Sequence, residues 1–283
     1  MRKSVLTLSV AAALATPGLA AAQAAAPAAA PAPSPVTGNM TIASDYRFRG
    51  ISQTYNGPAI QGGIDYAHPS GFYVGNWNSN VSSILFSGGS AIEMDFYGGF
   101  KKSFGDIGLD VGFIYYYYPK AEWNANTGST AGNAKFDNQE IYIGASWKWL
   151  SAKLNYSLSD YFGLNTEMAS GGYFVDKDTG AALDPAGTMG KSKGTYYLDI
   201  TATYPVTDKL NVIGHYGMLN VKTYNDLDYN DWKLGITYDM SGWLLGASYI
   251  DTDAKNNWYY LAGSRGLKDS GNGTVVLSIG KTF

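Results

Sequence analysis

The stretch TVVLSIGKTF, residues 274–283, alternates large apolar side chains with small or polar ones. Its apolar members share one parity: Val275, Leu277, Ile279 and Phe283. A period of two is typical of a β-strand with one apolar face and one polar face. Terminal residues of water-soluble domains usually fray and gain little from an apolar side chain. We therefore expect this apolar face to meet lipid rather than water.

The same alternation recurs along the chain in segments of about ten residues. It predicts twelve strands, near residues 40–49, 59–67, 71–81, 91–102, 107–118, 139–149, 151–162, 194–204, 209–220, 230–240, 242–251 and 273–283. Residues 71–81 fit either phase, and residues 107–118 carry tyrosines on both faces. The pattern indicates an all-β fold, because almost no segment has the period of a helix.

The connections between these strands alternate in length. The long ones are 50–58, 82–90, 119–138, 163–193, 221–229 and 252–272, and the short ones are 68–70, 103–106, 150, 205–208 and 241. Outer-membrane barrels have this arrangement, with short periplasmic turns and long extracellular loops. Unpaired backbone groups cost several kcal/mol each in hydrocarbon, so strands cross a bilayer only in a closed barrel. The sequence predicts a transmembrane antiparallel up-and-down β-barrel of about twelve strands.

Composition excludes several classes of site. The chain of 283 residues has no cysteine, so neither a disulfide framework nor a thiolate metal site is available. Lysine and arginine total 20 against 23 acidic residues, a net charge of −3 that argues against a nucleic-acid partner. Charged residues make up 15% of the chain, against roughly 25% in soluble domains. This low charge also favours a protein that faces lipid.

The N-terminal region is predicted to direct export. Arg2 and Lys3 precede an apolar run over residues 5–15 that is too short to span a bilayer, and small residues follow it. We expect a signal peptide over residues 1–22, cleaved between residues 20 and 24, with a membrane anchor as the alternative. Residues 23–38 are predicted to form an Ala/Pro-rich periplasmic tether, and residues 39–283 the barrel. A barrel of this kind belongs to the bacterial outer membrane.

If the apolar parity faces lipid, the opposite parity faces the lumen. The charged residues on this inward parity are Asp45, Arg47, Arg49, Asp65, Glu93, Asp95, Lys101, Glu140, Lys148, Lys153, Asp199, Lys233 and Asp239. Their signs are mixed, so the predicted function is a porin-like channel for passive diffusion of small polar solutes or ions. Two alternatives stay open: a closed structural or surface-interaction barrel without channel activity, and a soluble secreted β-protein or enzyme.

Aromatic residues lie where a barrel would have its two interfacial girdles. Those near short turns, on the periplasmic side, are Tyr66, Trp147, Trp149, Tyr204 and Trp243. Those near long loops, on the outer side, are Phe48, Trp232 and Tyr249. The alternative is that these side chains form the core of a soluble sandwich.

Catalysis and metal binding have little basis in this sequence, and we predict no enzyme, no cofactor and no metal site. His68 lies in a short turn, and His215 points into the lumen with no serine in its strand to complete a triad. Asp176 and Asp178 follow the spacing of a calcium loop, but the later bidentate glutamate is missing. A solvent-exposed turn is the simpler interpretation of these two carboxylates.

Two stretches near the N-terminus connect the chain to a known family. SDYRFRGISQT (residues 44–54), followed by PAIQGGIDYAHPSGFYVGNW (residues 58–77), resembles the N-terminal signature of the TorF family of porin-like proteins. The resemblance implies an outer-membrane barrel of a Gram-negative bacterium without defining its solute.

The last strand also resembles the C-terminal sorting signal of outer-membrane proteins. Val275, Leu277, Ile279 and Phe283 match that signal, whereas Lys281 departs from its usual apolar position. The resemblance implies recognition by the barrel-assembly machinery. Outer-membrane lipid, lipopolysaccharide and small polar solutes are the other expected partners, and a homo-oligomer is left open.

Overall fold

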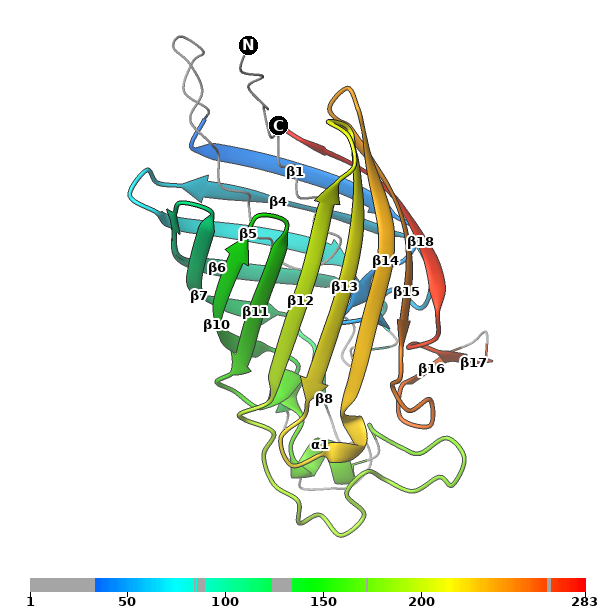
Figure 1. The fold of residues 1–283 in the computed structure, drawn as a ribbon. Helices are drawn as coiled ribbons and strands as arrows, with labels where there is room; N and C mark the ends of the chain where they lie inside the picture. Colours follow the sequence, from blue (N-terminus) through cyan, green and yellow to red (C-terminus); the bar gives the residue numbers. More distant parts are fainter. Residues whose placement is uncertain (1–33, 84, 86–89, 124–133, 172, 264–265) are drawn as a thin grey trace, which may run out of the picture.

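Each long strand pairs with the long strands before and after it in sequence, and together they form a closed antiparallel barrel (Figure 1). The computed structural model describes residues 34–83, 85, 90–123, 134–171, 173–263 and 266–283. Within these residues the barrel strands are β1 (Val36–Ala43), β4 (Ala59–Ala67), β5 (Phe72–Asn80), β6 (Ile92–Phe104), β7 (Ile107–Tyr117), β10 (Asn138–Trp147), β11 (Leu150–Ser157), β12 (Tyr196–Pro205), β13 (Leu210–Asn220), β14 (Tyr229–Met240), β15 (Trp243–Thr252) and β18 (Thr274–Thr282). The prediction of a twelve-stranded antiparallel barrel is confirmed.

The barrel closes where β1 meets β18. Thr41 pairs with Gln61 of β4 on one side and with Gly280 of β18 on the other. Gly280 allows this close approach, because a Cβ at that position would lie 2.6 Å from the Oγ1 of Thr41. Closure leaves no unpaired edge in the wall, which is the condition for strands to lie in hydrocarbon.

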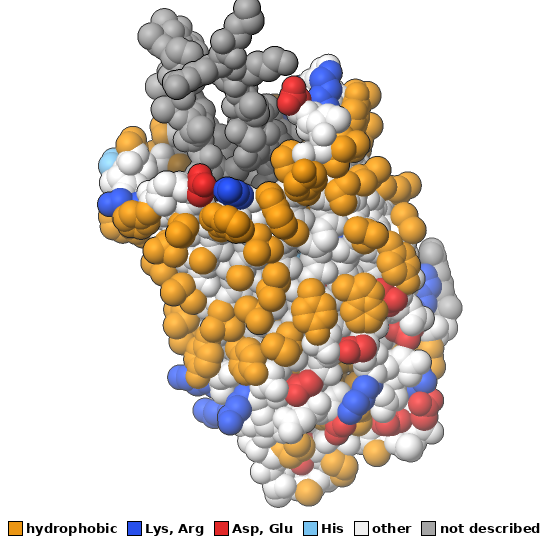
Figure 2. Space-filling model, in the orientation of Figure 1, with side chains coloured by type: hydrophobic (Ala, Val, Ile, Leu, Met, Phe, Trp, Pro, Cys, Tyr) orange, Lys and Arg blue, Asp and Glu red, His pale blue; other side chains and the backbone are white. Residues whose placement is uncertain are grey.

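The two faces of the wall follow the predicted parity. On β12, Ile200 and Tyr204 are exposed on the outside, whereas Tyr197 and Asp199 are buried in the lumen. On β10, Ile143 is exposed and Gly144 next to it is buried. Figure 2 shows the apolar side chains as a broad band over the strands. This distribution is the reverse of a soluble barrel, which keeps its apolar side chains inside.

The structure resolves the two strands whose phase the sequence left open. On β5, Tyr73 points into the lumen, where its hydroxyl donates to Asp110 at 2.6 Å, and Phe72 is exposed outside. On β7, Asp110 and Tyr116 are buried inside, so Tyr115 takes the outer parity. Tyrosines on both faces of β7 therefore reflect two different environments.

The two ends of the barrel differ in their connections (Figure 1). Short turns lie at one end, the turn end, together with the C-terminus and the start of β1. A two-residue turn joins β14 to β15, and its residues Ser241 and Gly242 have φ angles of 55° and 88°. Two positive φ angles are the signature of a type I′ hairpin turn. The opposite end, the loop end, holds the smaller elements: β2 (Arg47–Phe48), β3 (Ile51–Ser52), β8 (Glu122–Trp123), β9 (Ala134–Lys135), η1 (Tyr161–Gly163), α1 (Thr166–Ser170), η2 (Asn225–Leu227), β16 (Tyr260–Gly263) and β17 (Gly266–Asp269).

The first strand differs from its prediction at both ends. β1 begins at Val36, which pairs with Tyr66, so the barrel starts before residue 39. β1 ends at Ala43, and the predicted strand 40–49 is wrong beyond that point. Residues 44–58 leave the wall and contain a hairpin, whose own period of two prolongs the alternation seen in the sequence. The predicted signal peptide lies outside the described residues, as does the tether up to residue 33.

Most of the predicted girdle aromatics are exposed on the outside of the wall: Tyr66, Trp147, Trp149, Tyr204, Trp232, Trp243 and Tyr249. Phe48 is the exception. It lies in the lumen, where its ring centroid is 5.6 Å from those of Tyr116 and Phe162. Among the described residues, no helix is long and apolar enough to cross a membrane.

Candidate functional site

The hairpin β2–β3, which we call the lumen hairpin, lies inside the barrel. Its turn residues Arg49 and Gly50 have φ angles of 49° and 80°, as a type I′ turn requires. Gly50 is also needed for close approach, because a Cβ there would lie 2.7 Å from the Cβ of Asp231 on β14. The lumen hairpin therefore extends from the end of β1 to a different part of the wall.

The tip of the lumen hairpin makes a buried ion pair with the wall. Arg49 donates through one Nη to the Oε2 of Glu140 on β10 at 2.7 Å and through the other to the Tyr161 hydroxyl at 3.1 Å. Its guanidinium carbon lies 4.4 Å from the ring centroid of Tyr197. The other oxygen of Glu140 accepts from Asn138 at 3.0 Å. Such hydrogen bonds offset the desolvation of the two buried charges.

A second buried ion pair holds the base of the lumen hairpin. Arg47 Nε lies 2.5 Å from a carboxylate oxygen of Asp45, and the other oxygen accepts from the Ser52 hydroxyl at 2.7 Å. The Nη1 of Arg47 also donates to the carbonyls of Ser270 and Asn272, at 2.8 and 3.1 Å. These contacts join the hairpin to the connection that precedes β18.

The connection over residues 158–195 packs against the lumen hairpin from the loop end. Its Phe162 ring lies 5.6 Å from Phe48, 5.5 Å from Tyr116 and 6.1 Å from Tyr118, measured between centroids. We call these four side chains the aromatic cluster. With the buried ion pairs beside it, the aromatic cluster occupies part of the lumen in its loop half.

The strand register sets a row of charges that crosses the lumen wall. Successive cross-strand pairs run through Lys101, Asp110, Gly144, Lys153, Asp199, Gly217 and Asp231. We call its five charged members the charged row. Lys101 pairs with Asp110, and Lys153 with Asp199. Opposite charges on paired positions stabilise a sheet, so the row can keep its charge inside the barrel.

His215 lies beside the charged row. Its Nε2 is 2.9 Å from Asp231 Oδ1, and its Nδ1 is 3.0 Å from the Thr201 hydroxyl. The Thr201 hydroxyl donates to Asp199 at 2.8 Å, so its proton does not point to the imidazole. An activated nucleophile would give that proton to the histidine. The geometry is that of a lumen hydrogen-bond network.

The structure distributes the predicted lumen residues over three places. The lumen-hairpin segment carries Asp45, Arg47 and Arg49. The inward parity of the wall carries Asp65, Glu93, Asp95, Lys101, Glu140, Lys153, Asp199 and Lys233. Lys148 and Asp239 lie at the turn end.

Lys148 differs from the prediction, whereas Asp239 keeps the inward parity of β14 and has a further role. Lys148 is exposed in the turn after β10, with its Nζ 4.9 Å from the ring centroid of the outward-facing Trp147, so it does not line the lumen. Asp239 accepts from the backbone N–H of Gly242 at 2.7 Å and so caps the β14–β15 turn. A positive φ of 54° at Lys148 ends the alternation that the sequence pattern had extended to it.

Sequence reasoning missed two aspartates and the tyrosines that bind them. Tyr73 donates to Asp110 at 2.6 Å, and Tyr197 donates to Asp231 at 2.8 Å. Asp231 shares the parity of Lys233, so the alternation of β14 could have identified it. Asp110 was hidden because tyrosines occupy both faces of its strand.

The calcium-like sequence forms a turn. Asp176 Oδ1 accepts from the backbone N–H groups of Asp178 and Thr179, at 2.8 and 2.9 Å. Together with the hydrogen bond from Asn257, these interactions lower the pKa of Asp176, with Asn257 the largest cause. Across the part of the chain that the structure describes, no group of three or more histidines, aspartates or glutamates is arranged to hold a metal ion.

Comparison with solved structures finds distant likenesses. A KdgM porin in complex with disordered oligogalacturonate is 10% identical, with 88% of this chain and 97% of that chain covered and a TM-score of 0.47. A NanC porin is 11% identical, with 88% and 98% covered and a TM-score of 0.47. OprD from Pseudomonas aeruginosa is 10% identical, with 80% and 59% covered and a TM-score of 0.36. Likenesses this distant identify no solute for this chain.

A family model covers nearly the whole chain. It is described as "Bacterial protein of unknown function (Gcw_chp)" and matches residues 26–283, so the chain belongs to that family. No curated protein matches the sequence. The resemblance to the TorF family stays a prediction.

Proposed function

We propose that this member of the Gcw_chp family is an outer-membrane channel for small polar solutes and ions, and that the lumen hairpin closes it. The apolar outer band and the edge-free wall suit a lipid environment (Figure 2). The charged row suits a water-filled path, because charges on a lumen wall tune which ions pass. Its mixed signs favour weak selectivity over a preference for one sign.

One observation carries this proposal: the wall is complete without the lumen hairpin. β1 pairs directly with β4 from Val36 to Ala43, so residues 44–58 contribute no strand to the barrel. The hairpin is held by non-covalent contacts, chiefly Arg49 with Glu140 and Arg47 with the carbonyls of Ser270 and Asn272. Its release would therefore remove Phe48 and Arg49 from the loop half of the lumen and leave every wall ladder paired.

A permanently closed structural barrel is the second candidate. The aromatic cluster favours it, because Phe48 and Phe162 pack in the lumen much as they would in a soluble core. In that case the ion pairs would hold the hairpin in place at all times.

Replacement of the lumen hairpin separates the two candidates. The N–H of Gln53 donates to the carbonyl of Tyr46 at 2.7 Å, so two glycines can bridge these positions in place of residues 47–52. We expect the variant to give a larger and steadier conductance than the wild type in planar lipid bilayers, because the side chains of residues 47–52 no longer occupy its loop half.

The matched control replaces six other residues. Residues 176–181 lie in a solvent-exposed turn closed by the pairing of Val175 with Ala182, and two glycines can bridge them as well. This control should conduct like the wild type. Heat-modifiable migration on gels would show that each variant is a folded barrel. A folded hairpin variant that does not conduct would establish the closed barrel instead.

Export and assembly belong to the same proposal. A signal peptide over residues 1–22 would lead to the periplasm, and the assembly machinery would recognise the outward apolar side chains of β18 and Phe283. Phe283→Asp should then reduce the yield in the outer membrane, whereas Thr282→Asp should not. Equal yields would remove the sorting signal from the proposal.

A further inference from the structure

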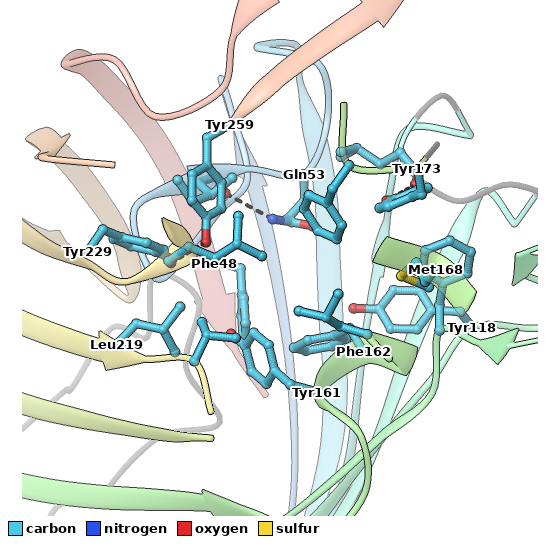
Figure 3. A pocket seen from close by; sticks show the side chains of 17 residues that line it. Phe48, Gln53, Tyr118, Tyr161, Phe162, Met168, Tyr173, Leu219, Tyr229 and Tyr259 are labelled. Carbon is cyan, nitrogen blue, oxygen red and sulfur yellow. Dashed lines mark hydrogen bonds between the residues drawn. The ribbon is translucent and has the colours of Figure 1, made fainter. Parts of the chain in front are cut away.

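An apolar cavity of about 130 Å³ lies at the loop end of the barrel (Figure 3). The lumen-hairpin segment contributes Phe48, Ile51 and Gln53 to its wall. The connection over residues 158–195 contributes Phe162, and β13 contributes Leu219. The cavity therefore exists only while the hairpin is folded into the lumen.

The wall of this cavity is apolar although five tyrosines line it: Tyr118, Tyr161, Tyr173, Tyr229 and Tyr259. Every one of their hydroxyls is bonded to another protein group, at 2.6 to 3.1 Å. The Glu93 carboxylate accepts from Tyr118, and the backbone carbonyls of Leu85, Arg49 and Leu227 accept from Tyr173, Tyr229 and Tyr259. The Tyr161 hydroxyl accepts from the Arg49 guanidinium. The tyrosines therefore present their rings to the cavity.

The lining also excludes a charged ligand. Among the described residues, none of the lining side chains is an aspartate, glutamate, lysine, arginine or histidine. Gln53 contributes a side-chain amide to the lining, and its Nε2 donates to the carbonyl of Ile51 at 3.1 Å. An ion placed here would lose its hydration without gaining a partner, which is strongly unfavourable.

The size and the ring geometry point to one aromatic ring. An engineered apolar cavity of about 150 Å³ stays dry and binds benzene. The rings around this cavity meet edge to face, with Tyr229 and Tyr259 at 5.1 Å and 76° and Phe48 and Phe162 at 5.6 Å and 82°. They offer both faces and edges, and an aromatic ligand can repeat the same contacts.

We propose that this cavity binds one small uncharged aromatic molecule of single-ring size. Binding needs the folded lumen hairpin, because Phe48 and Ile51 form part of the wall. A ligand that binds only this state stabilises it by mass action, so occupancy favours the closed lumen. The site goes beyond the proposed channel, since binding requires no conduction.

The test measures binding of 4-fluorophenol to the full chain in detergent, by ¹⁹F NMR against micelles without protein. We expect saturable binding of one equivalent. Two related probes define the site: 4-fluorobenzoate, with the same ring and a negative charge, and 6-fluoro-2-naphthol, with two rings. Both should bind the wild type roughly tenfold or more weakly, because one carries a charge and the other exceeds the volume.

Two substitutions at Leu219 change the volume without adding charge. Leu219→Phe should fill the cavity and weaken 4-fluorophenol binding by about tenfold or more, and Leu219→Ala should admit the two-ring probe. If Leu219→Phe fails to fold, the hairpin replacement tests the same point, because it removes Phe48 and Ile51. The replacement of residues 176–181 should bind like the wild type.

Three results would overturn the proposal: no saturable binding of 4-fluorophenol to the wild type, equal binding of the charged probe, or full binding by the folded hairpin replacement. None of them depends on conductance. Failure of the aromatic site and failure of the channel are therefore distinguishable.

Discussion

The loop half and the turn half of the lumen are occupied in different ways. In the loop half, the aromatic cluster and the Arg49–Glu140 pair come together because segments outside the wall fold into it. The charged row, in contrast, comes from the barrel strands alone and begins near the turn end, at Lys101 and Asp110. The first arrangement is a small protein core inside a barrel, and the second is a lining.

The interactions that stabilise the barrel wall are therefore different from those that keep the lumen hairpin in its closed position. A change in the charged row acts on a wall that hydrogen-bonded ladders hold on both sides. A change beside the lumen hairpin acts on a segment that no ladder joins to the wall. Substitutions in the loop half should therefore affect closure more strongly, in addition to stability.

The largest difference in folding stability is expected between two variants that place an arginine in different parts of the lumen. Leu219→Arg would bury an unpaired charge in the loop half, at a cost of several kcal/mol. Thr201→Arg would lie beside Asp199 and should cost much less, since opposite charges attract. Urea midpoints of the two variants in lipid vesicles give the comparison. Equal midpoints would mean that the two halves are equally accessible to water.

The next effect concerns the buried pair. Glu140→Ala leaves Arg49 buried without its carboxylate, which costs about 3–5 kcal/mol in comparable pairs. This loss destabilises the closed position of the lumen hairpin. Single-channel recordings should therefore show more frequent opening than for the wild type. Asp199→Ala should change opening less, because His215 keeps Asp231 at 2.9 Å. A larger effect from Asp199→Ala would locate the closure in the charged row.

A smaller effect on folding stability is expected from the outer face, which meets lipid in both halves of the barrel. Ile200→Arg near the middle of β12 should lower folding stability in lipid vesicles by about 2–4 kcal/mol, because the charge would face hydrocarbon. Thr201→Arg is the matched control, one residue away on the opposite face. Similar folding yields from these two variants would contradict the assignment of the faces.

The smallest effect is expected from an exposed ion pair of the same length as the buried one. Lys255 lies 2.7 Å from Asp226 at the loop end, and both side chains are largely exposed. Lys255→Ala should cost about 0–1 kcal/mol, less at high salt. Urea midpoints of the wild type and the variant at two salt concentrations measure this loss of stability. A loss as large as that from Glu140→Ala would show that burial does not decide the value of these pairs.

Much of the barrel could be predicted because its information is local. The faces of β12 and β10 follow from alternation, and the ends of most strands follow from the spacing of turns. Phe48 shows where this reasoning fails, because alternation identifies the two faces of a strand but not whether the strand belongs to the wall. Lys148 shows a second limit, since a single positive φ in a turn reverses the direction of a side chain.

The sequence by itself determined the fold class, the number of strands and the parity that faces the lumen, because each depends on neighbouring residues and a period of two. The tertiary structure alone decided that residues 44–58 fold inward and that Arg49 meets Glu140. These partners are 91 positions apart in the chain, and only barrel closure and strand register bring them together. The aromatic cavity has the same origin, because its wall comes from segments that share no local pattern.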